Sequence, residues 1–371
     1  MKTTSVALMR KLLLIMAIAG MILFALSSMA PFVNPARFWY IALTGLVFPW
    51  LLILMLVLLV ILAIKKSKLA FVAGALLLLS WPALSVTVGR KLSQSEASPK
   101  NDTAYVRVLS WNVFRWDEMR KHTADRPGNR ENMLEAVAGE NADVLVFHEF
   151  YEPRGNALKS FKANIVAIQA MGYPHYSFFP TSVIHTGTKH FGMAIFSRYP
   201  ITDSANKKFQ QSVHSEGLMY VDLKVGNKTL RVFSTHLESF KIGKSDYYGS
   251  NEGGLISSTK SSFASVRNAY RTRNEQAHLV REALESSPYP VIVCGNLGDI
   301  PASGTYRMIK GDYKDAFIEK GSGFGKTFRH VLPNLRLDYI LTDEKIEVDK
   351  FRVADLGHSD HFALVTDIVL P

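Results

Sequence analysis

The 371-residue sequence contains a single cysteine, Cys294, which excludes an intrachain disulfide. Cys294 follows the apolar run Val291–Val293, which is typical of a buried strand, so we interpret the thiol as a core group and not as a nucleophile. Acidic residues are almost absent from positions 1–100, where ten Lys and Arg stand against Glu96 alone. Of the chain's 43 basic and 32 acidic residues, positions 101–371 therefore keep 33 and 31. This nearly neutral part does not favour a nucleic-acid partner.

Charged side chains are absent from three long apolar stretches, residues 12–30, 38–64 and 69–89. A helix needs about 20 apolar residues to cross a bilayer, so we expect residues 1–89 to form a membrane anchor of three transmembrane helices. None of the stretches holds an ionisable residue, which argues against a transport path. The first stretch ends in Ser28-Met29-Ala30 and could instead be a cleaved signal peptide, although Pro31 argues against cleavage. Pro82 is a candidate kink in the third.

The orientation of the anchor follows from the positive-inside rule. Two basic clusters flank the stretches: Lys2, Arg10 and Lys11, and then Lys65, Lys66 and Lys68. Both should lie in the cytoplasm, which places the C-terminal part outside, on the extracytoplasmic face of a bacterial inner membrane. Arg90 and Lys91 argue mildly for the opposite orientation.

Residues 90–104 are polar and predict a linker, and residues 105–371 alternate short apolar runs with polar loops. We expect strands at 105–112, 143–149, 191–197, 218–225, 229–236, 290–295, 336–342 and 362–370, and helices at 130–141 and 266–286. This order predicts an α+β fold in which two packed sheets are flanked by helices.

Polar residues stand where several of these predicted strands end. They are Asn112, Glu149, His236, Asn296 and the group Ser359-Asp360-His361, while Asp338 lies within a strand. Gathered on one rim, such groups can bind a metal and a phosphate. Taken singly, Glu149 could be a solvated strand end and His236 a hydrogen-bonded core histidine.

Seven motifs occur in a characteristic order: LSWNV (109–113), DVLVFHEF (143–150), GMAIFSRYPI (192–201), FSTHL (233–237), VIVCGNLGDIPAS (291–303), RLDYIL (336–341) and HSDHFAL (358–364). This ordered set resembles the endonuclease/exonuclease/phosphatase (DNase I-like) superfamily, as a membrane-anchored bacterial-type member, over residues 104–371. The superfamily includes nucleases, inositol-phosphate phosphatases and sphingomyelinases. The resemblance implies a four-layer sandwich and hydrolysis of a phosphoester with Mg²⁺, or alternatively Mn²⁺.

The resemblance also implies roles for individual residues. Glu149 would be the main metal ligand, Asp360 would join the metal and water network, and Asn112 would place the metal or the phosphate. His236 would donate a hydrogen bond to a phosphate oxygen. His361, oriented by Asp338, would act as general base or bind the phosphate.

The sequence departs from the family pattern after the strand at 290–295. The usual Gly-Asp-Phe-Asn reads Gly295-Asn296-Leu297-Gly298 here, so an anionic partner for water and a donor for phosphate are both replaced. Asp299 adds a carboxylate one position later, although strand alternation would point it elsewhere. Phe114 and His148 also differ from the usual residues, and Phe114 weighs against a nuclease.

Three hypotheses follow. The first is a membrane-anchored, Mg²⁺-dependent phosphodiesterase or phosphatase that acts outside the cytoplasm on a lipid head group or another extracytoplasmic phosphoester. The second is an extracytoplasmic nuclease, for which the cluster Arg267, Arg271 and Arg273 is weak support. The third is a non-catalytic relative that binds a ligand or partner, supported by Asn296 and Gly298. The loop 240–263 is interpreted either as a substrate lid or membrane contact, or as a surface loop.

Overall fold

The computed structural model describes residues 2–91, 105–119, 128–184, 187–210, 216–239, 259–330 and 335–371. Most of the predicted linker, and residues 240–258 of the long loop, lie outside these described residues. Residues 259–263, which we expected in that loop, begin a helix instead. Arg90, assigned to the linker, lies in a short strand that pairs with Ser322.

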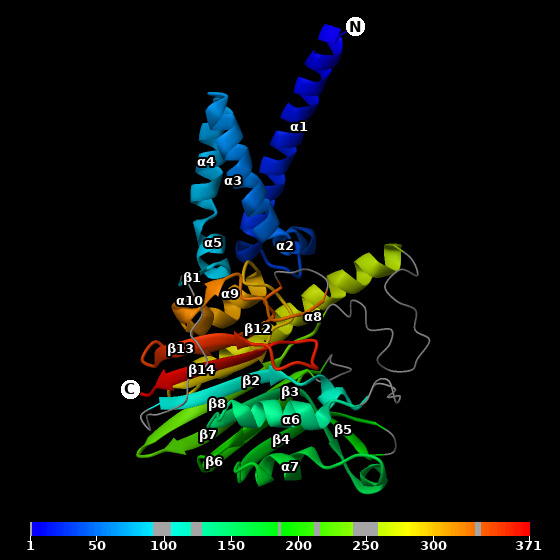
Figure 1. Cartoon of the computed structure of the whole chain (residues 1–371), viewed down its shortest axis with the longest axis vertical. Helices are drawn as coiled ribbons and strands as arrows, with labels where there is room; N and C mark the ends of the chain where they lie inside the picture. The colour runs from blue at the N-terminus through cyan, green and yellow to red at the C-terminus, as the bar shows by residue number, and fades with distance from the viewer. Residues whose placement is uncertain are drawn as a thin grey trace.

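The N-terminal helical region (residues 2–87) stands at one end of the molecule (Figure 1). Its elements are α1 (Lys2–Met29), η1 (Ala30–Phe32), α2 (Trp39–Gly45), α3 (Phe48–Ile64), α4 (Leu69–Leu79) and α5 (Trp81–Thr87). The segment Leu8–Phe32 is long and apolar enough to cross a membrane. The other two predicted spans are bent pairs: α2 and α3 meet at 67°, and α4 and α5 at 57°. Pro82 lies in the first turn of α5, where proline is well tolerated, so it follows the bend and does not interrupt a helix.

Two six-stranded sheets form the centre of the remaining chain (Figure 1). The first has the order β13 (Glu347–Ala354), β14 (Ala363–Val369), β2 (Tyr105–Asn112), β3 (Val144–Pro153), β5 (Lys189–Ser197) and β4 (His175–Ile184). The second has the order β10 (Lys314–Asp315), β12 (Asp338–Thr342), β9 (Val291–Asn296), β8 (Lys228–His236), β7 (Gly217–Val225) and β6 (Ile201–Lys208). A separate pair joins β1 (Gly89–Arg90) and β11 (Ser322–Gly323).

The sheets pack face to face through alternate apolar residues. Val108 of β2 and Val146 of β3 share one buried cluster with Val232 of β8 and Ile292 of β9. The opposite face of the first sheet packs under α6 (Arg130–Gly139) and α7 (Asn164–Ala170), and that of the second under α8 (Thr259–Glu285) and α9 (Gly304–Lys310). Near β12 lies the short α10 (Ala316–Lys320). The predicted α+β sandwich of two sheets flanked by helices is confirmed.

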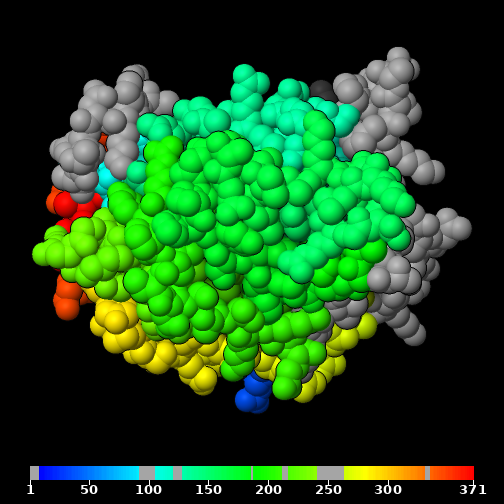
Figure 2. All heavy atoms as spheres, turned by 90° about the horizontal axis from the view of Figure 1, so that it is seen from below, coloured from blue at the N-terminus to red at the C-terminus, as the bar shows by residue number. Residues whose placement is uncertain are grey.

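The eight predicted strands all correspond to strands of the structure, whereas β1, β4, β6, β10, β11 and β13 were not predicted. All six lie at sheet edges, and β6 is exposed along nearly its whole length. An edge strand needs no continuous apolar face, so it has little periodic signal. Seen from the end opposite the N-terminal helical region, the middle of the chain covers most of the surface (Figure 2).

Candidate active site

One rim of the two sheets collects the predicted polar residues. In the second sheet, Asn296 ends β9 and is paired with His236 of β8 on one side and with Asp338 of β12 on the other. In the first sheet, Asn112 ends β2 beside His148 of β3. The structure therefore places these strand ends beside one another.

The two asparagines end their strands by the same local device. The side-chain oxygen of Asn112 accepts a hydrogen bond from the backbone N–H of Phe114 at 3.0 Å, and that of Asn296 accepts one from Gly298 at 3.1 Å. Such a turn closes the chain after the strand. It also leaves the NH₂ group of each amide as the group that can donate to a neighbour.

His361 and Asp338 form a close polar contact. The Nδ1 atom of His361 lies 2.7 Å from Oδ2 of Asp338, and both side chains are buried. Burial by itself would lower the pKa of His361, but the charge and hydrogen bond of Asp338 outweigh it, and Asp360 and Glu149 add to them. Together they raise the pKa of His361 to about 9. Asp338 thus fixes the ring so that Nε2 is the nitrogen available to a ligand.

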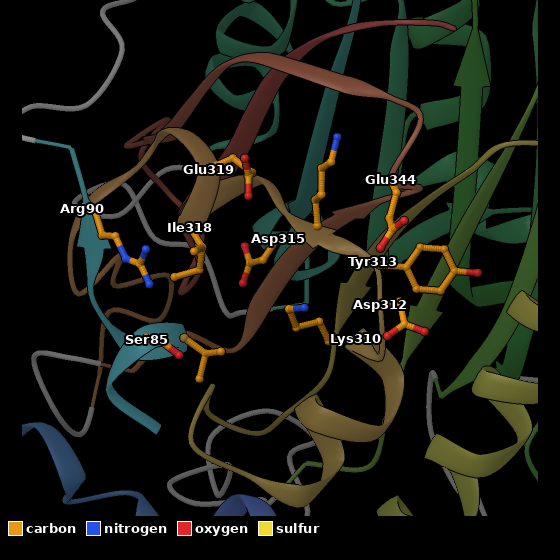
Figure 3. A pocket seen from close by; sticks show the side chains of 11 residues that line it. Ser85, Arg90, Lys310, Asp312, Tyr313, Asp315, Ile318, Glu319 and Glu344 are labelled. Atoms are coloured by element: carbon orange, nitrogen blue, oxygen red, sulfur yellow. The ribbon is translucent and has the colours of Figure 1, made fainter. Parts of the chain in front are cut away.

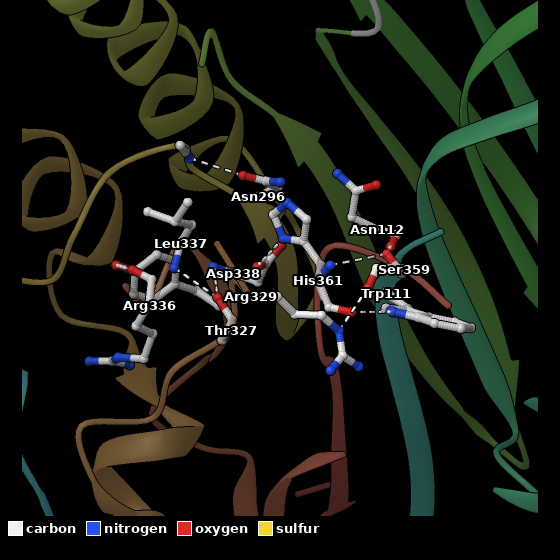
Figure 4. Close-up of polar contacts among 12 residues, drawn as sticks. Trp111, Asn112, Asn296, Thr327, Arg329, Arg336, Leu337, Asp338, Ser359 and His361 are labelled. Atoms are coloured by element: carbon white, nitrogen blue, oxygen red, sulfur yellow. Dashed lines mark hydrogen bonds and ion pairs between the residues drawn. The ribbon is translucent and has the colours of Figure 1, made fainter. Parts of the chain in front are cut away.

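Three residues to which the sequence analysis assigned no individual role hold this pair in place (Figure 4). The hydroxyl of Thr327 accepts the backbone N–H of Asp338 at 3.1 Å, and the indole of Trp111 donates to the backbone oxygen of His361 at 3.0 Å. The hydroxyl of Ser359 accepts the N–H of His361 at 3.1 Å and donates to the backbone oxygen of Asn112 at 2.6 Å. Ser359 therefore couples the end of β2 to the His361 backbone.

Glu149 sits beside Asn112 in a bulge of β3. The register between β3 and β5 shifts between Phe147 and Phe150, and Glu149 has a φ of +49°. A bulge redirects a side chain out of the normal alternation. Here it brings Oε1 of Glu149 within 3.3 Å of Nδ2 of Asn112, in a position that is only 6% exposed.

Arg115 is a site residue that sequence reasoning missed. Its Nε lies 3.7 Å from Oε2 of Glu149, and its guanidinium carbon lies 5.2 Å from the centroid of the Phe191 ring. Residues 114–117 all have positive φ, between 49° and 58°, although none is glycine. Left-handed backbone costs roughly 1–2 kcal/mol per residue, so this turn is held by its surroundings. No periodicity or motif in the sequence predicts such a turn.

The residues near Glu149 are compatible with a magnesium ion. Mg²⁺ is usually held by one or two carboxylates, with water and substrate phosphates completing its shell. A buried Glu149 oriented by Asn112 matches that mode. The described residues contain no group of three or more His, Cys, Asp or Glu side chains that could enclose a metal. Asp360 is half-buried next to His361, and its backbone oxygen accepts a hydrogen bond from Arg329.

Two further imidazoles lie close together, one on β3 and one at the end of β8. The rings of His148 and His236 are 6.1 Å apart, and both are buried. Nε2 of His148 is 3.2 Å from both the backbone oxygen of Cys294 and the hydroxyl of Ser234. Complete burial, reinforced by the neighbouring His236, lowers the pKa of His148 to about 3. His148 is thus a neutral hydrogen-bonding residue of the interior.

The stretch after β9 that departs from the family pattern makes buried contacts with Glu238 and with Arg273 of α8. Gly298 has a φ of +59°, and a Cβ there would lie 2.9 Å from the backbone oxygen of Glu238. Asp299 is fully buried and pairs with Nη1 of Arg273 at 3.3 Å, while Nε of Arg273 donates to the oxygen of Glu238 at 2.8 Å. Asp299 is therefore engaged with α8 and does not replace the missing carboxylate. Because its side chain is buried, Arg273 is not part of an exposed basic surface.

A pocket of about 520 Å³ lies at the other end of β12 (Figure 3). Its lining includes Ser85 of α5, Lys310 of α9, Glu319 of α10 and Glu344. Because β12 begins at Asp338 and ends at Thr342, just before Glu344, the strand separates this pocket from the rim. The pocket is distinct from the candidate active site.

Comparisons with known proteins agree with this fold. A model of the "Endonuclease/Exonuclease/phosphatase family" matches residues 109–361, and one of a "Domain of unknown function (DUF8431)" matches residues 10–87. The crystal structure of an endonuclease/exonuclease/phosphatase from Beutenbergia cavernae DSM 12333 is similar over 72% of each chain, at 19% identity and a TM-score of 0.50. A humanized D. rerio TDP2 is similar at 15% identity and a TM-score of 0.50, over 71% of this chain and 99% of its own.

The human Nocturnin catalytic domain with bound sulfate anion is similar at 18% identity and a TM-score of 0.48, over 71% of this chain and 93% of its own. No curated protein matches the chain significantly. Since the family model spans most of the chain, the chain belongs to the endonuclease/exonuclease/phosphatase family, whose members are hydrolases of phosphoesters and generally depend on divalent metal ions.

Proposed function

We propose that this protein is a membrane-anchored, metal-dependent hydrolase of an extracytoplasmic phosphoester. The observation that carries the proposal is the meeting of two buried pairs at one rim, Asp338 with His361 and Asn112 with Glu149. One pair supplies an oriented imidazole and the other an oriented carboxylate. Metal-dependent phosphoester hydrolysis uses a ligand for the cation and a group that orients water or binds the phosphate, and these two pairs can supply them.

In this proposal Glu149 holds Mg²⁺ or Mn²⁺, Asn112 orients the carboxylate, and Asp360 contributes to the surrounding water network. The ion, when bound, polarises the phosphate and offsets its charge. His236 donates a hydrogen bond to a phosphate oxygen. His361, held by Asp338 and protonated at neutral pH by its raised pKa, binds the phosphate; as a general base it would accept the proton of the attacking water only in its neutral form.

Asn296 is the residue that limits the expected rate. Its amide can donate a hydrogen bond to water or phosphate, but it cannot act as an anionic base. Removal of one well-placed polar group typically costs 10²–10³ in rate. We therefore expect a slow enzyme. The alternative hypothesis is a non-catalytic relative, and the residues Asn296 and Gly298 favour it.

The nearly neutral domain makes a nuclease the less favoured alternative. The anchor places the rim near a bilayer, so a lipid head group is a candidate phosphodiester or phosphomonoester. The position of the domain outside the cytoplasm rests on the basic clusters that flank the apolar stretches.

The test uses the full chain in detergent or nanodiscs with Mg²⁺. A generic phosphodiester, a phosphomonoester, DNA and phospholipid vesicles are the substrates. We expect hydrolysis that disappears in Glu149→Ala and on chelation of the metal, but persists in Glu282→Ala, which changes an exposed glutamate of α8. Activity equal in Glu149→Ala and wild type, or none on any substrate, would contradict the proposal.

A further inference from the structure

The N-terminal helical region packs directly on a loop of the candidate active site. One buried apolar cluster contains Met21 and Phe24 of α1 and Phe48 of α3 together with Ile300 and Ala302. Ile300 and Ala302 belong to the loop 297–303 that follows Asn296 at the end of β9. The helices thus cover the back of the loop in which this sequence departs from its family.

A second loop of the site joins the same cluster. Leu335 is buried in it, and Leu337 and Phe328 are half-buried against it. Leu337 immediately precedes Asp338. Phe328 also lies against His361, with ring centroids 4.9 Å apart and planes at 60°. Phe328 therefore contacts both the cluster and the imidazole of the site.

The contact is close enough to involve backbone atoms. A Cβ on Gly45, at the end of α2, would lie 2.9 Å from the backbone oxygen of Ala302 and 3.3 Å from Cδ1 of Ile300. A Cβ on Gly304 would lie 2.9 Å from the backbone oxygen of Val33. Neither position has room for a side chain. We call the surface formed by Gly45, Ile300, Ala302 and Phe328 the seam.

Polar contacts extend the packing along the N-terminal helical region. The guanidinium carbon of Arg307 lies 4.5 Å from the centroid of the Phe32 ring. Arg336, two residues before Asp338, donates from Nη2 to the backbone oxygen of Val86 and from Nη1 to Asp315 at 2.6 Å. A flexible tether would need neither these bonds nor backbone packing.

We propose that the N-terminal helical region is a structural part of the catalytic unit: the seam holds the loops next to Asn296 and Asp338, and Phe328 is a positioning residue for His361. The proposal rests on the proposed function in treating this rim as catalytic. Its physical basis is that packed apolar contacts fix loops that would otherwise expose buried side chains to water. A misplacement of 1 Å in a site can cost 10²-fold in rate.

A pair of glycine substitutions in the full chain tests the seam. Gly45→Leu inserts a side chain between α2 and the loop 297–303. Gly74→Leu inserts the same side chain in α4, where a Cβ would have nothing within 4 Å. Both add equal apolar volume to the N-terminal helical region, so the second variant controls for effects on insertion and expression.

We expect Gly45→Leu to raise amide hydrogen exchange in residues 297–303 and 335–341 and to lower kcat by tenfold to a hundredfold. KM for a water-soluble phosphodiester should change little, because the seam touches no substrate. Gly74→Leu should match wild type in all three measurements. Equal exchange and equal kcat in Gly45→Leu and Gly74→Leu would overturn the proposal.

Phe328 variants provide a second test that does not depend on folding of the Gly45 variant. Phe328→Ala removes the ring from His361, whereas Phe328→Tyr keeps it. The ¹⁵N resonance of Nδ1 of His361, assigned with His361→Gln, reports the hydrogen bond with Asp338 and is little affected by ring currents; it should move in Phe328→Ala and stay in place in Phe328→Tyr. An unmoved resonance in Phe328→Ala would refute the positioning role.

These readouts separate the two proposals. If wild type hydrolyses no phosphoester, the proposed function fails. Hydrogen exchange and the His361 resonance still decide whether the N-terminal helical region orders the rim. If wild type is active and neither readout responds to Gly45→Leu or Phe328→Ala, only the structural inference fails.

Discussion

At the scale of single residues, position 296 decides how far the site departs from its family. The side-chain oxygen of Asn296 accepts the N–H of Gly298, and an aspartate oxygen could accept the same bond. We therefore expect Asn296→Asp to fold normally and to raise kcat at least tenfold, because it restores an anionic partner for water. The measurement is steady-state hydrolysis with Mg²⁺. A variant no faster than wild type would show that the amide at 296 is not limiting.

Substitution of Gly298 should have a different effect from substitution of Asn296, because position 298 has no room for a side chain. Its φ is +59°, and a Cβ would lie 2.9 Å from the oxygen of Glu238. We expect Gly298→Asn to lower the free energy of unfolding by roughly 1–3 kcal/mol. Thermal unfolding of the full chain checks this. Gly226→Asn, at a position with φ of +61° and nothing within 4 Å, controls for the backbone conformation alone.

Glu118 gives a pH dependence that is independent of catalysis. Burial raises its pKa to about 7, against a partial opposing effect of the hydrogen bond from Asn164. In the unfolded chain Glu118 would lose its proton near pH 4.5. Between pH 4.5 and about 7 the folded state therefore binds more protons than the unfolded state. This contribution to stability is complete below pH 4.5 and is lost as pH rises through about 7.

Glu118→Gln should therefore raise the melting temperature relative to wild type at pH 8 and change it least below pH 4.5. Each unit of pKa difference corresponds to about 1.4 kcal/mol before screening by solvent. Thermal unfolding of both proteins at pH 4 and pH 8 gives the comparison. An equal difference at the two pH values would contradict an elevated pKa for Glu118.

Individual residues of the site differ in whether the sequence could predict them. Asn112 and His236 were predictable as members of the rim because each stands at the end of an apolar run. Arg115 was not, because its position depends on a left-handed turn that has no glycine to signal it. Thr327 was not, because its contact with Asp338 joins residues eleven positions apart through one hydroxyl.

At the scale of elements, strands with a buried face were predictable and edge strands were not. β9 is buried along its whole length, so its apolar run is unambiguous. β6 carries Thr, Asp, Ser, Asn and Lys, and pairs with β7 through backbone hydrogen bonds. α8 was predictable as a helix. The ion pair of its buried Arg273 with Asp299 was not, because it depends on how the helix packs on the sheet and not on the helical pattern.

The pair formed by Arg273 of α8 and Asp299 gives an element-scale prediction. Both side chains are at most 1% exposed. Arg273→Met should destabilise the protein by about 3–5 kcal/mol, because it leaves a buried carboxylate without its ion pair. Asp299→Asn in addition should recover part of that loss. The unfolding free energies of the two single variants and the double variant form a double-mutant cycle. Strictly additive effects would refute an interaction between Arg273 and Asp299.

At the scale of the whole molecule, the N-terminal helical region and the two-sheet domain share one apolar cluster. Length and hydropathy predicted the apolar segments, and Pro82 predicted a kink in the third, where α4 and α5 meet, but nothing predicted the bend between α2 and α3. Those bends turn α2 and α5 toward the domain, and long-range packing determines such directions. The polar residues 90–104 predicted only a short tether, and nothing in the sequence predicted the close contact between Gly45 and Ala302.

The orientation of the whole molecule can be tested with cysteines. Cys294 is buried, and burial raises its pKa to about 12, so the native thiol should not react with a maleimide. Ser204→Cys places a thiol on exposed β6, and Ser67→Cys places one in the turn between α3 and α4. Neither substitution alters the charges that determine topology. A membrane-impermeant maleimide on intact spheroplasts should label position 204 at once and position 67 only after permeabilisation, because the basic turn beside Ser67 is retained in the cytoplasm. The reverse pattern would place the catalytic rim in the cytoplasm and remove extracytoplasmic phosphoesters from its substrates.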